Sequence, residues 1–185
     1  MALPLKFTLV TVMLLLAACR SGPIHFHTLT PAHEGNHSRT TVGLIQIEML
    51  SVPPQVDRAQ IVIREGNSGL AILENQWWGA TLVDELRSAL VDQLSNNPVQ
   101  GRYSVRIDVQ RFDSVPGQYA LMDVEWRLRS DSTGDTARVI CRSTLQTPSG
   151  ASIDDLVLAQ QNNVKRLAAL ISQAATRPQA NCPTP

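Results

Sequence analysis

The fold class is decided by two segments, YSVRIDVQ at residues 103–110 and ALMDVEWRLR at residues 120–129. In both, apolar side chains alternate with polar or charged ones, so an extended strand would have one dry face and one mostly wet face. The turn signal Ser114-Val115-Pro116-Gly117 lies between them. A third alternating segment, from about residue 136 to residue 146, places on one side Ala137, Val139, Cys141 and Leu145. This pattern predicts an antiparallel sheet that is covered on one face.

Two amphipathic helices are predicted to cover the apolar face of this sheet. The first would begin with Asn75 as its N-cap and end at Asn96-Asn97-Pro98. Its apolar stripe contains Leu82, Val83, Leu86, Ala89, Leu90 and Leu94. The second would begin at Ser152, with Asp155 three residues on as in a capping box, and would end before Pro178. Its stripe contains Ile153, Leu156, Val157, Val164, Leu167, Ala168 and Ile171.

The N-terminal half is predicted to add further strands. Residues 42–50 form one, and residues 61–64 and 70–73 form a hairpin around the turn at residues 66–69. The piece Phe26-His27-Thr28-Leu29 is a candidate for a short first strand. Trp77 and Trp78 would start the first helix, as a cover for the core or, alternatively, as a ligand site. The order of elements predicts an α+β fold, a single domain with an antiparallel or mixed sheet of about six strands and two amphipathic helices packed on one face.

The N-terminus has the pattern of a secretory signal, with Lys6 before an apolar run from Phe7 to Leu15. This run is shorter than the ~20 apolar residues of a membrane-spanning helix. The residues Leu16-Ala17-Ala18-Cys19 resemble the lipobox of bacterial lipoproteins, in which the peptidase cuts before the cysteine and the thiol then carries diacylglycerol. We therefore predict cleavage between Ala18 and Cys19 and lipid attachment at Cys19, where two or three acyl chains would anchor stably. The alternative is an ordinary signal with a chance cysteine.

Composition divides the chain into four parts. Residues 1–18 would be the signal peptide and 19–41 the lipidated N-terminus with a tether and the short first strand. Residues 42–176 would be the α+β domain and 177–185 a Pro-rich tail. The full chain has 16 basic and 16 acidic residues, and aromatic residues make up 4% of it. The lack of excess charge and the few aromatic side chains argue against nucleic acid and against a stacking surface for sugars.

Assignment of Cys19 to lipid leaves two cysteines. In an oxidising compartment Cys141 and Cys182 would form a disulfide. The alternative is two separate thiols, with Cys141 as a small apolar residue of the core. The four histidines, His25, His27, His33 and His37, are irregularly spaced before the folded region, with no completing cluster of Cys, Asp or Glu, so no metal or other cofactor is predicted.

Several motifs resemble the PqiC-like family, the auxiliary lipoproteins of ABC-type and MCE-type transport systems. Residues 53–64, PPQVDRAQIVIR, resemble the LPxYLDRPQIVxR stretch of that family, and residues 78–82, WGATL, resemble its WAEPL helix start. The similarity continues in its opening strand, its hairpin and its closing helix, at residues 23–29, 108–113 with 124–128, and 152–175. The motifs follow the family's order and cover nearly the whole mature chain.

The resemblance implies a function. Members of the family are outer-membrane lipoproteins that work with a periplasm-spanning MCE protein, a conduit for lipids between two membranes, and they can form rings. For this chain it implies a docking role without enzymatic chemistry, facing the periplasm, in support of envelope integrity. The likeness also implies an MCE-type membrane protein as partner and a homo-oligomer. Arg20 after Cys19 favours the outer membrane, because an aspartate there is the common inner-membrane retention signal in enteric bacteria.

Other functions remain open at this point. A structural envelope lipoprotein could bind the cell wall or another membrane complex. An enzyme is disfavoured by the absence of a Gly-x-Ser-x-Gly elbow and of a Gly-rich phosphate loop.

The surface expected to meet a partner is the stretch from Pro53 to Arg64. There Asp57 and Arg58 place adjacent opposite charges beside a rigid Pro-Pro turn. The alternative for these two residues is a local ion pair of little energetic worth. The apolar positions of the chain are just enough to fill one helix-on-sheet core, so one subunit is not expected to hold a lipid by itself.

Overall fold

Seven strands and two helices make up the part of the chain that the computed structural model describes, which is residues 22–32, 43–97, 99–130, 138–176 and 182–184. The strands form a four-stranded and a three-stranded sheet. The α+β class, the two helices and the single domain of the sequence prediction are confirmed. The expected sheet of about six strands is instead two mixed sheets, because the N-terminal hairpin pairs with the first strand and not with the main sheet.

The four-stranded sheet contains the alternating segments. β5 (Gly101–Val115), β6 (Tyr119–Ser130) and β7 (Arg138–Pro148) form an antiparallel meander. Gly117, with a φ of 74°, lies in the tight turn between β5 and β6. β2 (Gly43–Ser51) pairs with the other edge of β5 in parallel. Parallel neighbours need a crossover, and β3, β4 and α2 supply it here.

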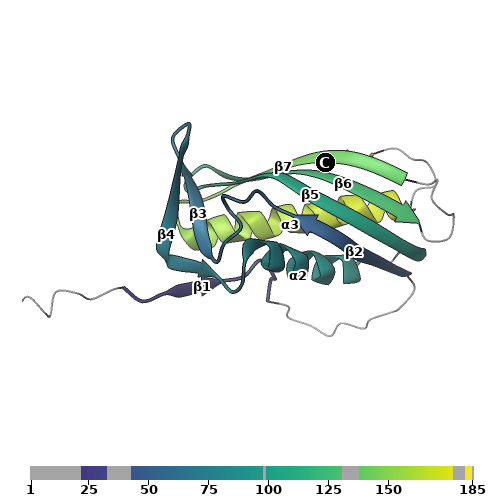
Figure 1. Cartoon of the computed structure of the whole chain (residues 1–185), viewed down its shortest axis with the longest axis horizontal. Helices are drawn as coiled ribbons and strands as arrows, with labels where there is room; N and C mark the ends of the chain where they lie inside the picture. The colour runs from purple at the N-terminus through teal and green to yellow at the C-terminus, as the bar shows by residue number, and fades with distance from the viewer. Residues whose placement is uncertain (1–21, 33–42, 98, 131–137, 177–181, 185) are drawn as a thin grey trace, which may run out of the picture.

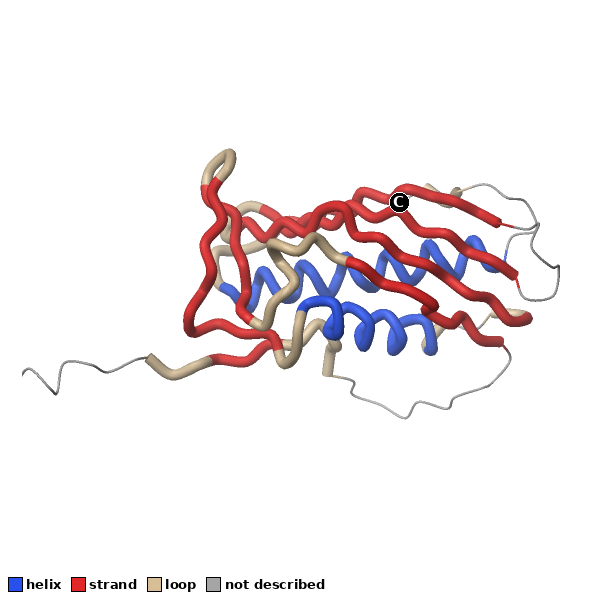
Figure 2. The backbone as a smooth tube through the Cα atoms, in the orientation of Figure 1, coloured by secondary structure: helices blue, strands red, loops and turns tan. Residues whose placement is uncertain are grey.

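The three-stranded sheet has the order β1-β4-β3. β3 (Gln60–Glu65) and β4 (Gly69–Trp78) form the predicted antiparallel hairpin, and β1 (His25–His27) pairs in parallel with the end of β4. Figure 2 shows this sheet at one end of the long axis, with the hairpin turned away from the strands of the main sheet.

Both helices lie on the same face of the four-stranded sheet (Figure 1). α2 (Leu82–Ser95) packs against β2 and α3, and α3 (Ile153–Thr176) packs against β6 and β7. Their buried residues follow the predicted stripes, such as Leu86 on α2 and Leu167 and Ile171 on α3, each at most 1% exposed. The core therefore lies between this pair of helices and the dry face of the sheet.

Trp126 is the largest completely buried side chain of this core. It faces Ile107 of β5 and Cys141 of β7 across the two ladders. Its indole Nε1 donates a hydrogen bond of 3.0 Å to Ser143 Oγ. The one polar atom of the buried ring is therefore satisfied, as burial of an indole requires.

α3 begins where the sequence predicts. The Asp155 amide donates to Ser152 Oγ at 3.0 Å, and the Ser152 amide donates to Asp155 Oδ2 at 3.4 Å. These two hydrogen bonds form a capping box, which satisfies backbone donors that the first helical turn leaves without a partner.

Two amide side chains fix α3 to the sheet. Gln160 and Asn163 are completely buried on its inner face. Gln160 Nε2 donates to the Asp113 carbonyl oxygen and Asn163 Nδ2 donates to the Ala120 carbonyl oxygen, each at 3.1 Å. Asn163 Oδ1 accepts a bond of 2.7 Å from Thr147. The helix is thus bonded to β5, β6 and β7 near the turn that joins β5 to β6.

The predicted start of the first helix is wrong. Asn75 lies inside β4, and α2 begins at Leu82 with Thr81 at the N-cap position. β4 continues to Trp78 because Trp77 pairs with Phe26 on one side and with Gln60 on the other. Pairing with two strands thus prevails over the local capping signal of Asn75. Trp78 is 3% exposed and covers the core, as expected, whereas Trp77 is only partly buried.

Candidate functional site

The lipid-attachment residues lie outside the described part of the chain. Ala18 and Cys19 precede Gly22, the first residue that the structure describes. Cleavage and acylation therefore stay predictions from the sequence. In the described residues, no helix has the length and the apolar content to span a bilayer.

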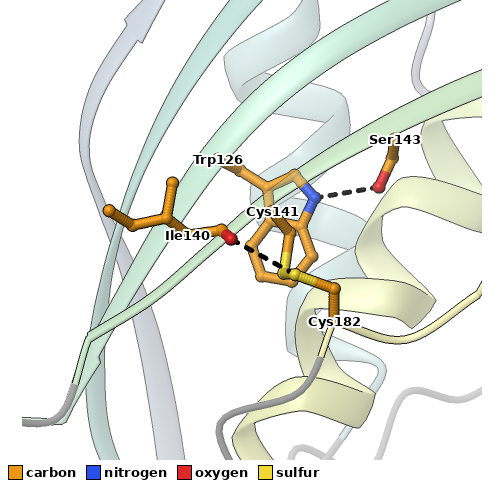
Figure 3. Close-up of a disulfide and its surroundings, with 5 residues drawn as sticks. All are labelled: Trp126, Ile140, Cys141, Ser143 and Cys182. Atoms are coloured by element: carbon orange, nitrogen blue, oxygen red, sulfur yellow. Dashed lines mark hydrogen bonds between the residues drawn. A yellow bond between two sulfur atoms is a disulfide. The ribbon is translucent and has the colours of Figure 1, made fainter.

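Cys141 and Cys182 are joined by a disulfide, with their Cα atoms 5.5 Å apart. Figure 3 shows the bond beside the ring of Trp126, which is the cross-strand neighbour of Cys141. Cys182 Sγ also lies 3.2 Å from the Ile140 carbonyl oxygen. This is a contact without a proton, since a disulfide sulfur carries none. The bond attaches the C-terminal tail to the main sheet.

The loop between β2 and β3 contains Asp57 and Arg58 of the predicted partner surface, while the end of that stretch lies in β3, where Ile61 and Val62 are buried. The amides of Val56 and Asp57 both donate to the Pro53 carbonyl oxygen, at 3.0 and 3.2 Å, so the loop is a hydrogen-bonded turn. Asp57 is exposed, and its Oδ1 accepts a bond of 3.3 Å from the Val83 amide in the first turn of α2. Asp57 therefore stabilises the positive end of a helix, besides any contact with a partner.

Arg58 has a different environment from its neighbour. Its side chain is half-buried, and its buried Nε has no hydrogen-bond partner among the described residues. Buried donors in folded proteins are usually satisfied, so an unpartnered one needs an explanation. Arg64 Nε is buried without a hydrogen-bond partner in the same way, and another molecule cannot reach a buried atom. A role of Arg58 in partner contact therefore stays a prediction from the sequence.

A buried carboxylate holds the segment after β1 in place. Glu85 of α2 is 8% exposed, and its Oε2 accepts bonds from Thr28 Oγ1 at 2.8 Å and from the Leu29 amide at 2.9 Å. The side chain of Leu29 is completely buried behind this contact. The sequence carries no sign of this role of Glu85, because a glutamate in the first turn of a helix is normally an exposed charge.

His27 connects β1 to two further elements. One ring nitrogen lies 2.7 Å from Gln76 Oε1 of β4, and the other lies 3.4 Å from Asp154 Oδ1 at the start of α3. These three side chains, with His25 and Ile153, line a hollow of about 260 Å³. In the described residues, no group of three or more His, Cys, Asp or Glu side chains could hold a metal ion.

The face of the main sheet opposite the helices carries ion pairs. Glu48 accepts from Arg106 and Arg129, both at 2.9 Å, and Arg142 donates two bonds to Asp123, at 3.0 and 2.6 Å. The bonds from Arg106 hold the pKa of Glu48 below its usual value, and those from Arg142 do the same for Asp123. Arg106, Arg129 and Arg142 thus have carboxylate partners, so this part of the face is not an excess-charge surface for anions.

Two hollows of about 100 and 160 Å³ lie between these charges. Both contain Arg106 and Arg127 in their walls, and neither is predominantly apolar. Sites for small molecules have volumes of about 300 to 1,000 Å³ and mostly apolar walls. These hollows are therefore gaps between paired side chains.

Residues 33–37 read His-Glu-Gly-Asn-His, the letter pattern of a zinc-binding His-Glu-x-x-His helix. That chemistry needs both histidines on one face of a helix, and Gly35 and Asn36 are poor helix formers. The segment lies outside the described residues. The pattern is the one sequence feature that favours an enzyme, and it is tested below.

Comparison with known families gives a match that covers residues 27–172, most of the chain, to the family described as ABC-type transport auxiliary lipoprotein component. The chain belongs to this family. As an ABC-type transport auxiliary lipoprotein, it has an accessory role in transport, in agreement with the resemblance of its motifs. The matched residues include all described strands but part of β1, and both helices nearly completely.

Solved structures share the fold of this auxiliary lipoprotein. An uncharacterised protein has a TM-score of 0.67 at 17% identity, over 82% of this chain and 98% of its own. A protein from Xanthomonas campestris has a TM-score of 0.62 at 18% identity, over 82% of this chain and 95% of its own. At such identities the likeness establishes the fold alone. A comparison with curated proteins gave no match.

Proposed function

We propose that this auxiliary lipoprotein is cleaved after Ala18, acylated at Cys19, and anchored in the outer membrane facing the periplasm. There it docks an MCE-type membrane protein of an ABC-linked system that moves lipids between the two membranes. The observation that carries the proposal is the family match over residues 27–172. The lipobox-like residues before Cys19 and the arginine at position 20 support the anchor and its membrane.

The architecture supports a docking role without a lipid-carrying one. The helices and the sheet bury a core that side chains such as Trp126, Leu86 and Met122 fill completely, all at 0% exposure. The hollows described above reach about 260 Å³ and have polar residues in their walls. Acyl chains need a large apolar cavity. Any lipid would therefore pass between subunits or through the partner.

Affinity capture in the native host tests the proposed partner. The full-length protein, with a C-terminal tag, is cross-linked in intact cells and recovered from membranes. We expect a protein with an MCE domain among the captured partners, together with other copies of the chain. The matched control is Cys19→Ser, which should leave a soluble or uncut form and lose the partner. Unchanged membrane fractionation of Cys19→Ser would contradict the anchor.

The alternatives give different outcomes in the same experiment. A structural envelope lipoprotein would recover cell-wall fragments or another membrane complex and no MCE protein. An enzyme that uses residues 33–37 would hold zinc in about one-to-one ratio, a content that His33→Ala with His37→Ala would abolish. Zinc-free protein with full capture of the MCE partner is the result we expect.

A further inference from the structure

The three-stranded sheet carries an apolar surface that none of the contacts above uses. Phe26 of β1 is 67% exposed, and Ile24, two positions before it, is 49% exposed. Residues two apart in an extended segment point to the same side. Phe26 stacks edge-on against Trp77 of β4, its register partner, with ring centroids 6.3 Å apart. We call Ile24, Phe26 and Trp77 the β1 patch.

The exposure of the β1 patch is built into the fold. The Gly79 amide donates to the His27 carbonyl oxygen at 2.9 Å, directly behind the patch. The Glu85 carboxylate holds Thr28 and the buried Leu29, and β1 pairs with β4 in register. These contacts fix the strand, so Phe26 cannot turn inward without breaking them.

The β1 patch lies close to the proposed lipid anchor. Ile24 follows Cys19 by five positions. An extended chain covers at most about 3.5 Å per residue, so Ile24 lies within about 18 Å of the acylated residue. Figure 1 shows β1 at one end of the long axis of the domain. This end, and not the far ends of β6 and β7, must therefore face the bilayer that holds the anchor.

We propose that the β1 patch inserts into the interfacial region of the bilayer that holds the Cys19 acyl chains. The inference rests on the proposed acylation. Tryptophan suits the level of the lipid headgroups, because its ring is apolar and its N–H is polar. Phenylalanine and isoleucine suit the boundary between the headgroups and the acyl chains. The anchor keeps the patch next to lipid at all times, so the effective concentration of lipid at the patch is high even when few copies of the protein are present. Lipid is therefore more available to cover the patch than a second copy of the chain.

Insertion would also orient the molecule. With two attachments, the acyl chains and the β1 patch, the domain could not rotate freely as it could about a single attachment. Its long axis would stand away from the membrane, with the end of the main sheet where β6 ends and β7 begins toward the periplasm.

Tryptophan fluorescence tests the insertion. The acylated protein is reconstituted into phosphatidylethanolamine and phosphatidylglycerol vesicles that contain lipid brominated in the upper acyl chains. Trp77 is the partly exposed tryptophan, while Trp78 and Trp126 are 3% and 0% exposed. We expect quenching by brominated lipid that Trp77→Phe largely abolishes and that Phe26→Glu strongly reduces. The control is Leu158→Glu, a residue of α3 that is 61% exposed, which should leave the quenching unchanged.

The possible failures can be told apart. Protein that does not float with the vesicles would contradict the anchor and, with it, the insertion. Protein that floats but shows no more quenching than Trp77→Phe would overturn the insertion alone. A third outcome is that Trp77 is shielded from aqueous iodide but is not quenched by brominated lipid. If this shielding is lost when fewer protein molecules are reconstituted per vesicle, the occupant is a second copy of the chain, and the insertion would also be overturned.

Discussion

Asp123 is a buried carboxylate on the charged face of the main sheet, 4% exposed. The two hydrogen bonds from Arg142, and a further one of 3.2 Å from Thr144, lower the pKa of Asp123. A lowered pKa means that the folded protein keeps this carboxylate ionised to a lower pH than the unfolded chain does. The resulting stability is complete above the unfolded pKa and is lost as the pH falls through the folded pKa.

Asp123→Asn should therefore lower the free energy of unfolding by about 1–2 kcal/mol at neutral pH. The difference from the parent protein should shrink below about pH 4, where the unfolded carboxyl becomes protonated. Urea denaturation at a series of pH values measures both effects. Asp108→Asn is the control, at an exposed position of β5 on the same face of the sheet. Its oxygens accept from the neutral side chains of Ser51 and Gln110 and not from an arginine, so the change in stability should be less than about 0.5 kcal/mol. A pH-independent difference for Asp123→Asn would disprove this account.

Asp57 and Arg58 should respond differently to substitution. Asp57→Ala removes an acceptor from the first turn of α2 and should cost about 1 kcal/mol of stability. Arg58→Glu breaks no described hydrogen bond of its Nε and should leave the melting temperature nearly unchanged, while it should weaken capture of the proposed MCE partner. Calorimetry and affinity capture of the same variants separate the two effects. Undiminished capture of Arg58→Glu would remove this residue from the partner surface.

Residue roles that depend on distant elements had no signal in the sequence. Glu85 is bonded to Thr28, more than fifty positions earlier in the chain, and Asn163 is bonded to Ala120. Both are polar residues within a helical segment, and the spacing of the apolar residues around them does not indicate that they are buried. Ser152 and Asp155 were predictable, since a capping box is made within four residues.

Elements with a strong local pattern were predicted closely. The period of two placed β5, β6 and β7, and the apolar stripe placed α3, because each pattern reports on one continuous buried face. The parallel pairing of β2 with β5 and that of β1 with β4 had no such pattern. Strand order depends on which elements cover which surface, and a single sequence does not record that choice.

The disulfide should stabilise the folded protein by holding the C-terminal tail against β7. Cys141 and Cys182 are 41 positions apart. Closing a loop of this size restricts the unfolded chain, and its loss should cost about 2–4 kcal/mol. We expect the urea midpoint to fall on reduction of the parent protein but not on reduction of Cys141→Ala with Cys182→Ala. Two alkylatable thiols in the unreduced protein isolated from its native host would show that the bond does not form in the cell.

For the molecule as a whole, the filled core predicts that one subunit binds no phospholipid by itself. Native mass spectrometry of monomers released from detergent should show the acyl groups of the anchor and no further phospholipid. The physical reason is that the hollows of the described structure are small and have charged or polar side chains among their lining residues. A phospholipid bound stoichiometrically to a monomer would make this protein a carrier and would refute the docking role.

The crossover between β2 and β5 has a consequence for biogenesis. β2 pairs only with β5 in the described structure, and the pairing begins with Gly43 opposite Gly101. The hydrogen bonds of β2 therefore cannot form until β5 is present. A chain exported by the proposed route leaves the secretion channel N-terminus first. Ile45, Ile47 and Leu50 would then reach the periplasm as an unpaired apolar edge, and contacts of such high order form slowly. The main sheet could therefore be completed only after β5 has also been exported. By that time the proposed acyl chains at the N-terminus could already be inserted in a membrane.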